Sequence, residues 1–247
     1  MFRQSLLFQF KHGDHICVFY RTSESLREVL VPYIAEGLRR GERCFCAQTP
    51  EICKQLVFDL RFLGVDTDSA IRRGALEIHT VDEVYFPNRK FEPNVMMDLL
   101  LHSMEDAWRQ GFSALRTAGE LAWASEGGTD CDQLLAYEKL VEEIFPGKLV
   151  LGMCQYNVDK FSPEILERVI NTHRQHLREG VPTSLHSGIT IRTPNCWTEI
   201  VADRLVLNPN YYYVVQRRRP AEILGWGMAP SFEMANQQAE LLASLAV

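Results

Sequence analysis

The stretch ICVFY at residues 16–20 decides the fold class of this chain. It is a continuous run of apolar residues rich in β-formers, which is typical of a strand buried on both faces of a parallel sheet. A polar turn, RTS at residues 21–23, follows it, and apolar residues then recur at helical spacing between Leu26 and Leu38. This order of strand, turn and helix predicts the first unit of an α/β fold.

The same alternation continues along the chain. Helix starts are indicated by TPE at residues 49–51 and SPE at residues 162–164, where a hydroxyl cap precedes a proline and an acid. Further apolar runs predict strands near residues 44–47, 76–79, 112–116 and 149–154. Alternation sustained this far predicts a three-layer α/β domain over residues 10–192, with a mainly parallel sheet and helices on both faces.

For residues 193–247 the sequence predicts an irregular C-terminal extension that ends in a helix over residues 231–246. Ser231 can cap this helix. Apolar residues then alternate at spacings of three and four, the pattern of a coiled-coil seam, at Phe232, Ala235, Ala239, Leu242 and Ala246. The seam fits a self-association or relay helix, and it fits a helix packed on its own domain nearly as well.

Composition and charge exclude several classes of protein. The 247 residues are 46% hydrophobic and 23% charged, which is ordinary for a globular protein. A formal net charge of −6 argues against direct nucleic-acid binding. No segment approaches the ~18 apolar residues of a membrane helix, and the N-terminus lacks the order of a signal peptide. With seven cysteines and no CxxC pair, the sequence predicts a cytoplasmic protein with free thiols.

In parallel sheets, ligands bind outside the carboxyl ends of the strands. Glu120 and Trp123 fall there, where an acid beside an aromatic can hold a small molecule, although a helix-start acid and a core aromatic explain them equally well. Arg116 lies in an apolar strand and needs a buried partner, for which Glu120 and Glu138 are candidates. The predicted ligand-binding residues are Tyr20, Arg21, Thr22, Gln48, Arg116, Glu120, Trp123, Tyr137, Glu138 and Tyr156.

Imidazole and thiol groups raise a separate metal hypothesis, because both suit zinc or copper. The candidates are His15, Cys17, Cys154 and His173. Their spacing matches no standard motif, and His15 begins its strand, at the end opposite the predicted pocket. A hydrogen-bonded core histidine is the favoured interpretation of His173. No motif therefore requires a metal or another cofactor.

Several elements resemble the opening and middle of MEDS domains, the sensory domains named after methanogens, methylotrophs and the dichloromethane-response repressor. The most specific is LRTAGELAW at residues 115–123, and the others, in the same order as in the family, are GDHICVFY (13–20), EGL (36–38), GE (41–42), YE (137–138), CQY (154–156) and His173. The resemblance covers residues 10–212. It implies a ligand-sensing domain in signal transduction or transcriptional control, which binds a small molecule such as a hydrocarbon derivative and relays occupancy to a homodimeric or signalling partner.

The opening is also similar to KaiC-type ATPases, which implies a RecA/KaiC-like fold. In those proteins the loop after the first strand is a glycine-rich element with a phosphate-binding lysine. Here the loop is YRTSES at residues 20–25, with no glycine, no lysine and an added Glu24. The sequence thus predicts no enzymatic activity. A degenerate nucleotide-binding protein or ATPase is the alternative, and an interaction module without a ligand is a third reading.

Overall fold

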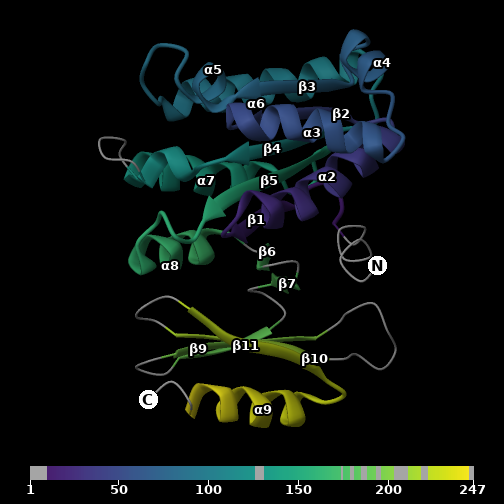
Figure 1. The fold of residues 1–247 in the computed structure, drawn as a ribbon. Helices are drawn as coiled ribbons and strands as arrows, with labels where there is room; N and C mark the ends of the chain where they lie inside the picture. Colours follow the sequence, from purple (N-terminus) through teal and green to yellow (C-terminus); the bar gives the residue numbers. More distant parts are fainter. Residues whose placement is uncertain are drawn as a thin grey trace. The chain divides into compact units, whose positions relative to one another are not determined.

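The computed structural model describes residues 10–125, 131–173, 175–178, 181–184, 188–192, 196–202, 211–217 and 222–244. The chain divides into two compact units (Figure 1). One consists of Met1–Phe161 with Arg168–Pro182, and the other of Ser162–Glu167 with Thr183–Val247. The strand β8 (Gly188–Arg192) belongs to the second sheet, so this division falls on the N-terminal side of the boundary that the sequence suggests at residue 192.

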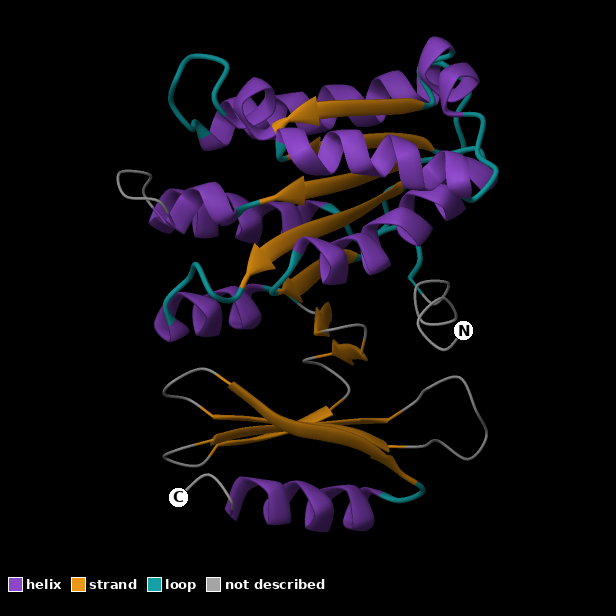
Figure 2. Cartoon of the chain, in the orientation of Figure 1, coloured by secondary structure: helices purple, strands orange, loops and turns teal. Residues whose placement is uncertain are grey.

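A mainly parallel sheet forms the centre of the first unit (Figure 2). Its strand order is β3-β2-β4-β5-β1-β6-β7, and the pairs from β3 through to β6 are parallel. The strands are β1 (His15–Tyr20), β2 (Arg43–Gln48), β3 (Leu76–Thr80), β4 (Leu115–Glu120), β5 (Val150–Asn157), β6 (Gln175–Arg178) and β7 (Val181–Ser184). The predicted α/β class is confirmed.

Helices cover both faces of this sheet. They are α2 (Ser23–Arg39), α3 (Pro50–Phe62), α4 (Thr67–Arg72), α5 (Val81–Tyr85), α6 (Pro93–Arg109), the 3-10 turn η1 (Ala122–Ser125) and α7 (Cys131–Ile144). A further helix, α8 (Pro163–Thr172), is divided between the two units. The two predicted caps are confirmed, since the hydroxyls of Thr49 and Ser162 accept hydrogen bonds from the first turns of α3 and α8. Strand β4 starts and ends later than predicted, because Phe112 and Ser113 still belong to the turn that follows α6.

Alternation along the central strands sorts side chains between the two faces. Ile16, Val18 and Tyr20 join a core cluster with the buried residues of α2 and α3. His15, Cys17 and Phe19 therefore point to the other face. In the parallel register His15 lies beside Gly152 and Cys17 beside Cys154, so His15 and Cys154 share the face that α6 and α7 cover.

The second unit is a four-stranded antiparallel sheet with one helix, and not the irregular segment expected from the sequence. Its strand order is β11-β10-β9-β8, with β9 (Cys196–Ala202), β10 (Tyr211–Arg217), β11 (Glu222–Ala229) and α9 (Phe232–Ser244). Two glycines in β11, Gly225 and Gly227, interrupt the apolar alternation by which a strand is usually recognised.

The predicted seam of α9 packs against the sheet of its own unit. Ala235 and Ala239 are fully buried in a core cluster with Ile200 and Val215, and Leu242 packs against that cluster. Phe232 and Ala246, the outer members of the seam, lie outside the residues whose side chains are described. Of the two readings of the seam, the structure has the helix packed on its own domain. Within the described ranges, no helix is long and apolar enough to cross a membrane.

Candidate functional site

Four polar side chains converge in the first unit, on the sheet face covered by α6 and α7. His15 comes from β1, Cys154 from β5 and Glu138 from α7, and His173 directly follows α8. One nitrogen, sulfur or oxygen atom of each lies within 4.8 Å of the corresponding atoms of the other three. His15, Glu138 and His173 are buried and Cys154 is partly buried. We call these four residues the His–Cys–Glu cluster.

Hydrogen bonds to groups outside the cluster orient both imidazoles. His173 Nδ1 lies 2.9 Å from the carbonyl oxygen of Val169, which can only accept, so this nitrogen carries a proton. His15 Nδ1 lies 3.1 Å from Glu142 Oε2, again an acceptor. Each Nε2 atom therefore faces the cluster. Glu138 Oε2 is 2.8 Å from His173 Nε2 and 3.3 Å from His15 Nε2.

The carboxylate of Glu138 dominates the electrostatics of the cluster. Burial raises the pKa of Glu138, but hydrogen bonds and charge attraction from His15 and His173 outweigh burial and hold it well below its usual range. Burial lowers the pKa of His15, yet Glu138 and Glu142 overcome this and raise the pKa to about 9. Burial, followed by the charge of Glu138, raises the pKa of the Cys154 thiol, which donates to Glu138 Oε1 at 3.4 Å. The carboxylate thus holds the other three groups together.

An apolar cavity of about 60 Å³ borders the cluster. His15, Tyr137 and Cys154 line it, and its remaining walls include Val84, Met96, Leu100, Val141, Phe145 and Met153. Roughly 10–15 Å³ is enough for one water molecule, so the cavity is large enough for a compound of a few non-hydrogen atoms. A small, mainly apolar molecule placed here would meet a thiol and an imidazole at one wall.

Two glycines in the sheet let aromatic walls of this cavity approach the backbone. A Cβ atom at Gly119 would overlap the hydroxyl of Tyr85. A Cβ atom at Gly152 would lie 2.7 Å from Cε2 of Phe145. Both aromatic side chains line the cavity, so its shape depends on the absence of side chains at these two strand positions.

Three of the predicted ligand-binding residues meet at the carboxyl edge of the sheet, on the face covered by α2 and α3. The Tyr20 hydroxyl donates to Glu120 Oε1 at 2.7 Å, and this oxygen also accepts from the Ala122 amide at 2.8 Å. Gln48 Nε2 donates to the Ala118 carbonyl at 3.3 Å. Glu120 is therefore held by hydrogen bonds inside the protein.

Two buried polar atoms at this edge, Gln48 Oε1 and Gln155 Oε1, have no hydrogen-bond partner among the residues that the structure describes. The buried hydroxyl of Tyr156 has none there either, but the Tyr156 ring lies on the opposite face of the sheet, beside Phe19 and His173. Gln155 was not predicted, although it lies in the CQY element. An amide oxygen left unpaired in the interior costs free energy, so these two oxygens are candidates to accept a hydrogen bond from a water molecule or a ligand.

The other predicted residues are distributed over the first unit. Arg21 forms an ion pair with Asp159 at 2.5 Å, and Thr22 caps α2. The ring of Trp123 packs against Tyr85, Phe86 and Phe91. Tyr137 lines the cavity and Glu138 belongs to the cluster.

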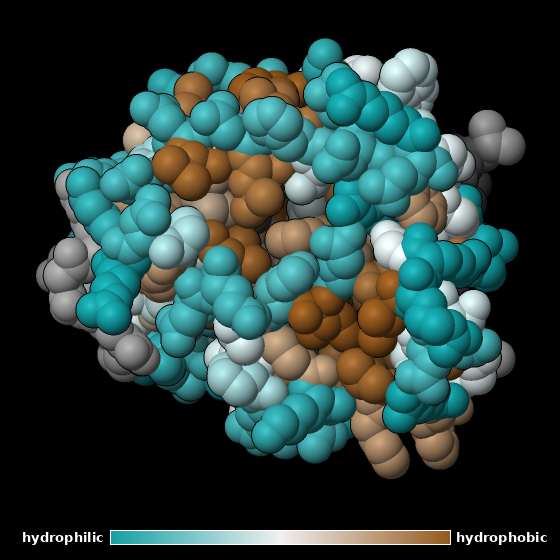
Figure 3. Space-filling view, turned by 90° about the horizontal axis from the view of Figure 1, so that it is seen from above, coloured by the Kyte–Doolittle hydropathy of each residue, from teal (hydrophilic) through white to brown (hydrophobic). Residues whose placement is uncertain are grey.

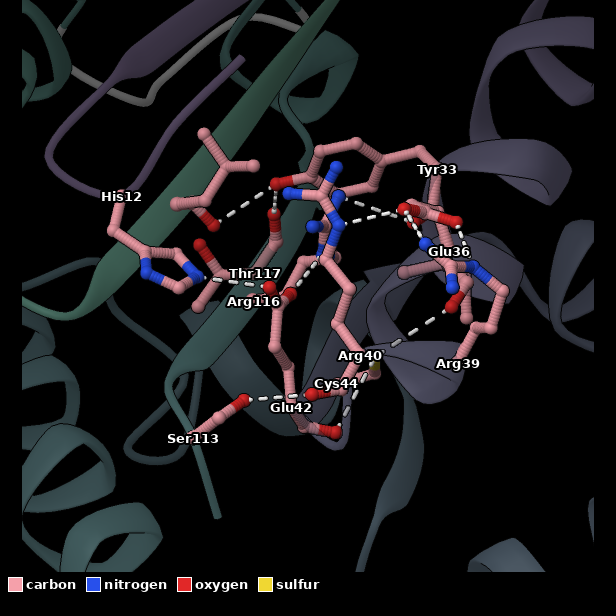
Figure 4. A network of polar contacts seen from close by, with 12 residues as sticks. His12, Tyr33, Glu36, Arg39, Arg40, Glu42, Cys44, Ser113, Arg116 and Thr117 are labelled. Atoms are coloured by element: carbon pink, nitrogen blue, oxygen red, sulfur yellow. Dashed lines mark hydrogen bonds and ion pairs between the residues drawn. The ribbon is translucent and has the colours of Figure 1, made fainter. Parts of the chain in front are cut away.

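The prediction that Glu120 or Glu138 pairs with Arg116 is wrong. Its Nε donates to Glu42 Oε2 at 2.5 Å (Figure 4). Among the described residues, neither Glu120 nor Glu138 forms an ion pair with it. Glu42 lies immediately before β2, whose residue Cys44 pairs with Arg116 in the sheet register, whereas Glu120 closes β4 on the far edge. His12 also contacts this carboxylate, with Nε2 2.8 Å from Glu42 Oε1.

The structure brings together three of the four residues of the metal hypothesis, His15, Cys154 and His173, and adds Glu138. Cys17 is the neighbour of Cys154 in the strand register, but it is not one of the four converging residues. Spacing along the sequence could not indicate this group, because its members come from four separate elements. The carboxyl-edge rule also points elsewhere, since the cluster lies on a face of the sheet.

Comparison with protein families matches residues 14–174 to the MEDS family, described as the methanogen/methylotroph, DcmR sensory domain. Among curated proteins, the transcriptional repressor DcmR of Methylorubrum extorquens is 27% identical over 166 residues. This match covers 66% of the chain and 58% of the repressor, so the chain spans little more than half the length of that relative.

Solved structures share the fold at low identity. An uncharacterized protein of Pyrococcus horikoshii, crystallised with an unknown peptide, has a TM-score of 0.50 at 11% identity, over 87% of this chain and 92% of that chain. A KaiC-like protein of the same archaeon has a TM-score of 0.48 at 10% identity, covering 89% and 85%. The flagellar accessory protein FlaH of Methanocaldococcus jannaschii has 0.44 at 11%, covering 86% and 89%. The likeness at a TM-score of 0.50 concerns the fold alone, whereas the match over residues 14–174 shows that the chain belongs to the MEDS family of sensory domains.

Proposed function

We propose that this chain is the ligand-sensing part of a cytoplasmic regulator, and that its ligand is a small molecule held in the cavity beside His15 and Cys154. Membership of a sensory family and similarity to a transcriptional repressor support a role in transcriptional control. The observation that carries the choice of site is the cavity itself, which joins an apolar interior to one polar wall.

The size and lining of the cavity define the class of ligand. About 60 Å³ accommodates a compound of a few non-hydrogen atoms, and the aliphatic walls favour a short hydrocarbon skeleton. The Cys154 thiol, the His15 imidazole and the Tyr137 side chain supply a wall that suits one polar or polarisable substituent. A small hydrocarbon derivative, such as a short alcohol, amine or haloalkane, satisfies both requirements.

A protein partner is part of the same proposal, because a sensor has to pass on its state. Two aromatic side chains on α3 are unusually exposed, Phe58 at 67% and Phe62 at 84%, and Ile71 on α4 is also exposed. Figure 3 views the molecule from above and shows apolar residues gathered in patches between hydrophilic ones. Exposed apolar side chains of this kind support contact with a second copy or a signalling protein.

ATP hydrolysis is the alternative function, and the start of α2 argues against it. Thr22 and Ser25 cap each other there: the Ser25 amide donates to Thr22 Oγ1 and the Thr22 amide to Ser25 Oγ, both at 3.2 Å. These amides are consequently engaged within the chain, and the loop offers no lysine for a phosphate group.

Blocking the cavity tests the sensory proposal. Ser103 is a buried residue of α6 that lines the cavity, and its neighbour His102 is exposed on the same helix. We expect wild type and His102→Leu to bind members of a panel of one- to four-carbon alcohols, amines and haloalkanes, measured by ligand-observed NMR. Ser103→Leu fills the cavity and should abolish that binding while the circular dichroism spectrum is retained. Equal binding by Ser103→Leu, or no binding of any compound to wild type, would contradict the proposal.

A further inference from the structure

The donor atoms of the His–Cys–Glu cluster form a set that zinc binds in proteins. Two imidazole nitrogens, one sulfur and one carboxylate oxygen make four ligands of the kinds that Zn²⁺ accepts. Around a tetrahedral zinc ion with bonds of about 2.0–2.3 Å, ligand atoms lie roughly 3.3–3.8 Å apart. His15 Nε2 is 3.1 Å from Cys154 Sγ and 3.3 Å from Glu138 Oε2, while Cys154 Sγ is 3.4 Å from Glu138 Oε1. The remaining separations range from 2.8 Å, between His173 Nε2 and Glu138 Oε2, to at most 4.8 Å, so shifts of up to roughly 1 Å would bring the four atoms to this spacing.

The surroundings of the two histidines are those of metal ligands. A histidine ligand generally donates its second ring N–H to a carboxylate or a backbone carbonyl, which fixes the tautomer and the direction of the ring. His15 Nδ1 has such a partner in Glu142, and His173 Nδ1 has one in the Val169 carbonyl. A neutral imidazole has a single lone pair, and in both rings it is then on Nε2, the atom that faces the cluster.

We propose that His15 Nε2, His173 Nε2, Cys154 Sγ and a carboxylate oxygen of Glu138 bind one zinc ion. This inference stands independently of the proposed sensory function, since it concerns only the cluster and its hydrogen-bonded surroundings. Because His15 and Cys154 also line the cavity, the ion would lie at the polar wall of that cavity.

The experiment uses the full chain, expressed in zinc-supplemented medium and purified without a metal-affinity step. Elemental analysis should find one zinc per chain in wild type and in two controls, Cys53→Ser and His102→Gln, which change a cysteine and a histidine outside the cluster. Cys154→Ser and His173→Gln should lose more than 100-fold in zinc affinity. Glu142→Gln changes the hydrogen-bond partner of His15 rather than a zinc ligand, and this variant should lose about 10–100-fold in zinc affinity.

Cobalt gives a first readout on the wild-type protein, for which no variant has to fold. Wild-type protein stripped of zinc and titrated with Co²⁺ should develop the visible bands of a tetrahedral site and a thiolate-to-cobalt charge-transfer band. The charge-transfer band should disappear in Cys154→Ser and persist in Cys53→Ser. A wild-type protein without this band, or one that binds zinc no more tightly than Cys154→Ser, would overturn the proposal and would identify the cluster as a hydrogen-bonded acid–base network.

Discussion

Arg116 and Glu42 form an ion pair that is almost completely removed from solvent, with side chains 1% and 0% exposed (Figure 4). The guanidinium also donates to the Tyr33 carbonyl at 3.2 Å and lies 4.5 Å from the centre of the Tyr33 ring. Gly37 makes room for it, since a Cβ atom there would come within 2.5 Å of Arg116 Cδ. The pair therefore joins α2, β4 and the residue before β2.

Arg116→Ala should strongly destabilise the first unit. Removing one partner of a buried pair leaves the other charge uncompensated, which costs about 3–5 kcal/mol. Arg109→Ala is the control, because Arg109 forms an exposed ion pair with Glu105 on α6. This variant should lose about 0.5 kcal/mol or less in free energy of unfolding. Urea denaturation followed by circular dichroism gives both values. A similar midpoint for the two variants would show that the pair does not stabilise the fold.

Gly119→Ala should destabilise the protein and distort the cavity through Tyr85. The added methyl group would overlap the Tyr85 hydroxyl, and overpacking of this kind costs about 1–3 kcal/mol. Tyr85→Phe removes the overlapping atom. The double variant should therefore lose less free energy of unfolding than the two single variants lose together. A double-mutant cycle in urea measures this coupling. Strict additivity would mean that the clash is relieved elsewhere.

Thr22→Ala should lower stability by about 1 kcal/mol, because it removes the cap of α2. We expect neither the wild type nor this variant to release phosphate from ATP in the presence of Mg²⁺. Measuring phosphate release at matched protein concentrations, alongside the thermal melt, tests both statements. Magnesium-dependent turnover in wild type that disappears in Thr22→Ala would instead establish a nucleotide site at this loop.

Ala239→Glu should unfold the second unit and leave the first intact. Ala239 is fully buried between α9 and the sheet, where a carboxylate would have no partner. Gln237→Glu places the same acid at an exposed position of the helix and is the matched control. Hydrogen exchange should show lost protection in β9, β10 and β11 only for Ala239→Glu. If protection is lost equally in β1 and β5, the two units unfold together.

The regular parts of the fold were predictable from local sequence. The apolar runs at residues 16–20 and 149–154 became adjacent central strands, and the proline-containing caps marked two helices. Local patterns of this kind depend on residues close together in the chain. The second sheet was missed although β10 carries the β-rich run YYYVV at residues 211–215, and in β11 two glycines interrupt the alternation.

The candidate site was only partly predictable, for a physical reason. Arg116 could be recognised as a buried charge. Its partner Glu42 is 74 residues away in the sequence, and only the pairing of β2 with β4 brings the two together. Likewise Glu138 was predicted as a ligand-binding residue, and His15 and His173 as separate metal candidates. Their convergence depends on how α7, β1 and the end of α8 pack together, which no spacing rule describes.

The strand order has a consequence for how the chain is made. Strand β1 lies between β5 and β6, and the described sheet does not pair it with β2. Residues 15–20 leave the ribosome well before their neighbours at residues 150–157. Until then an apolar strand with two open edges is exposed, which is the situation in which nascent chains aggregate or recruit chaperones. A fragment that stops before Val150 should therefore be insoluble, however well β2, β3 and β4 assemble.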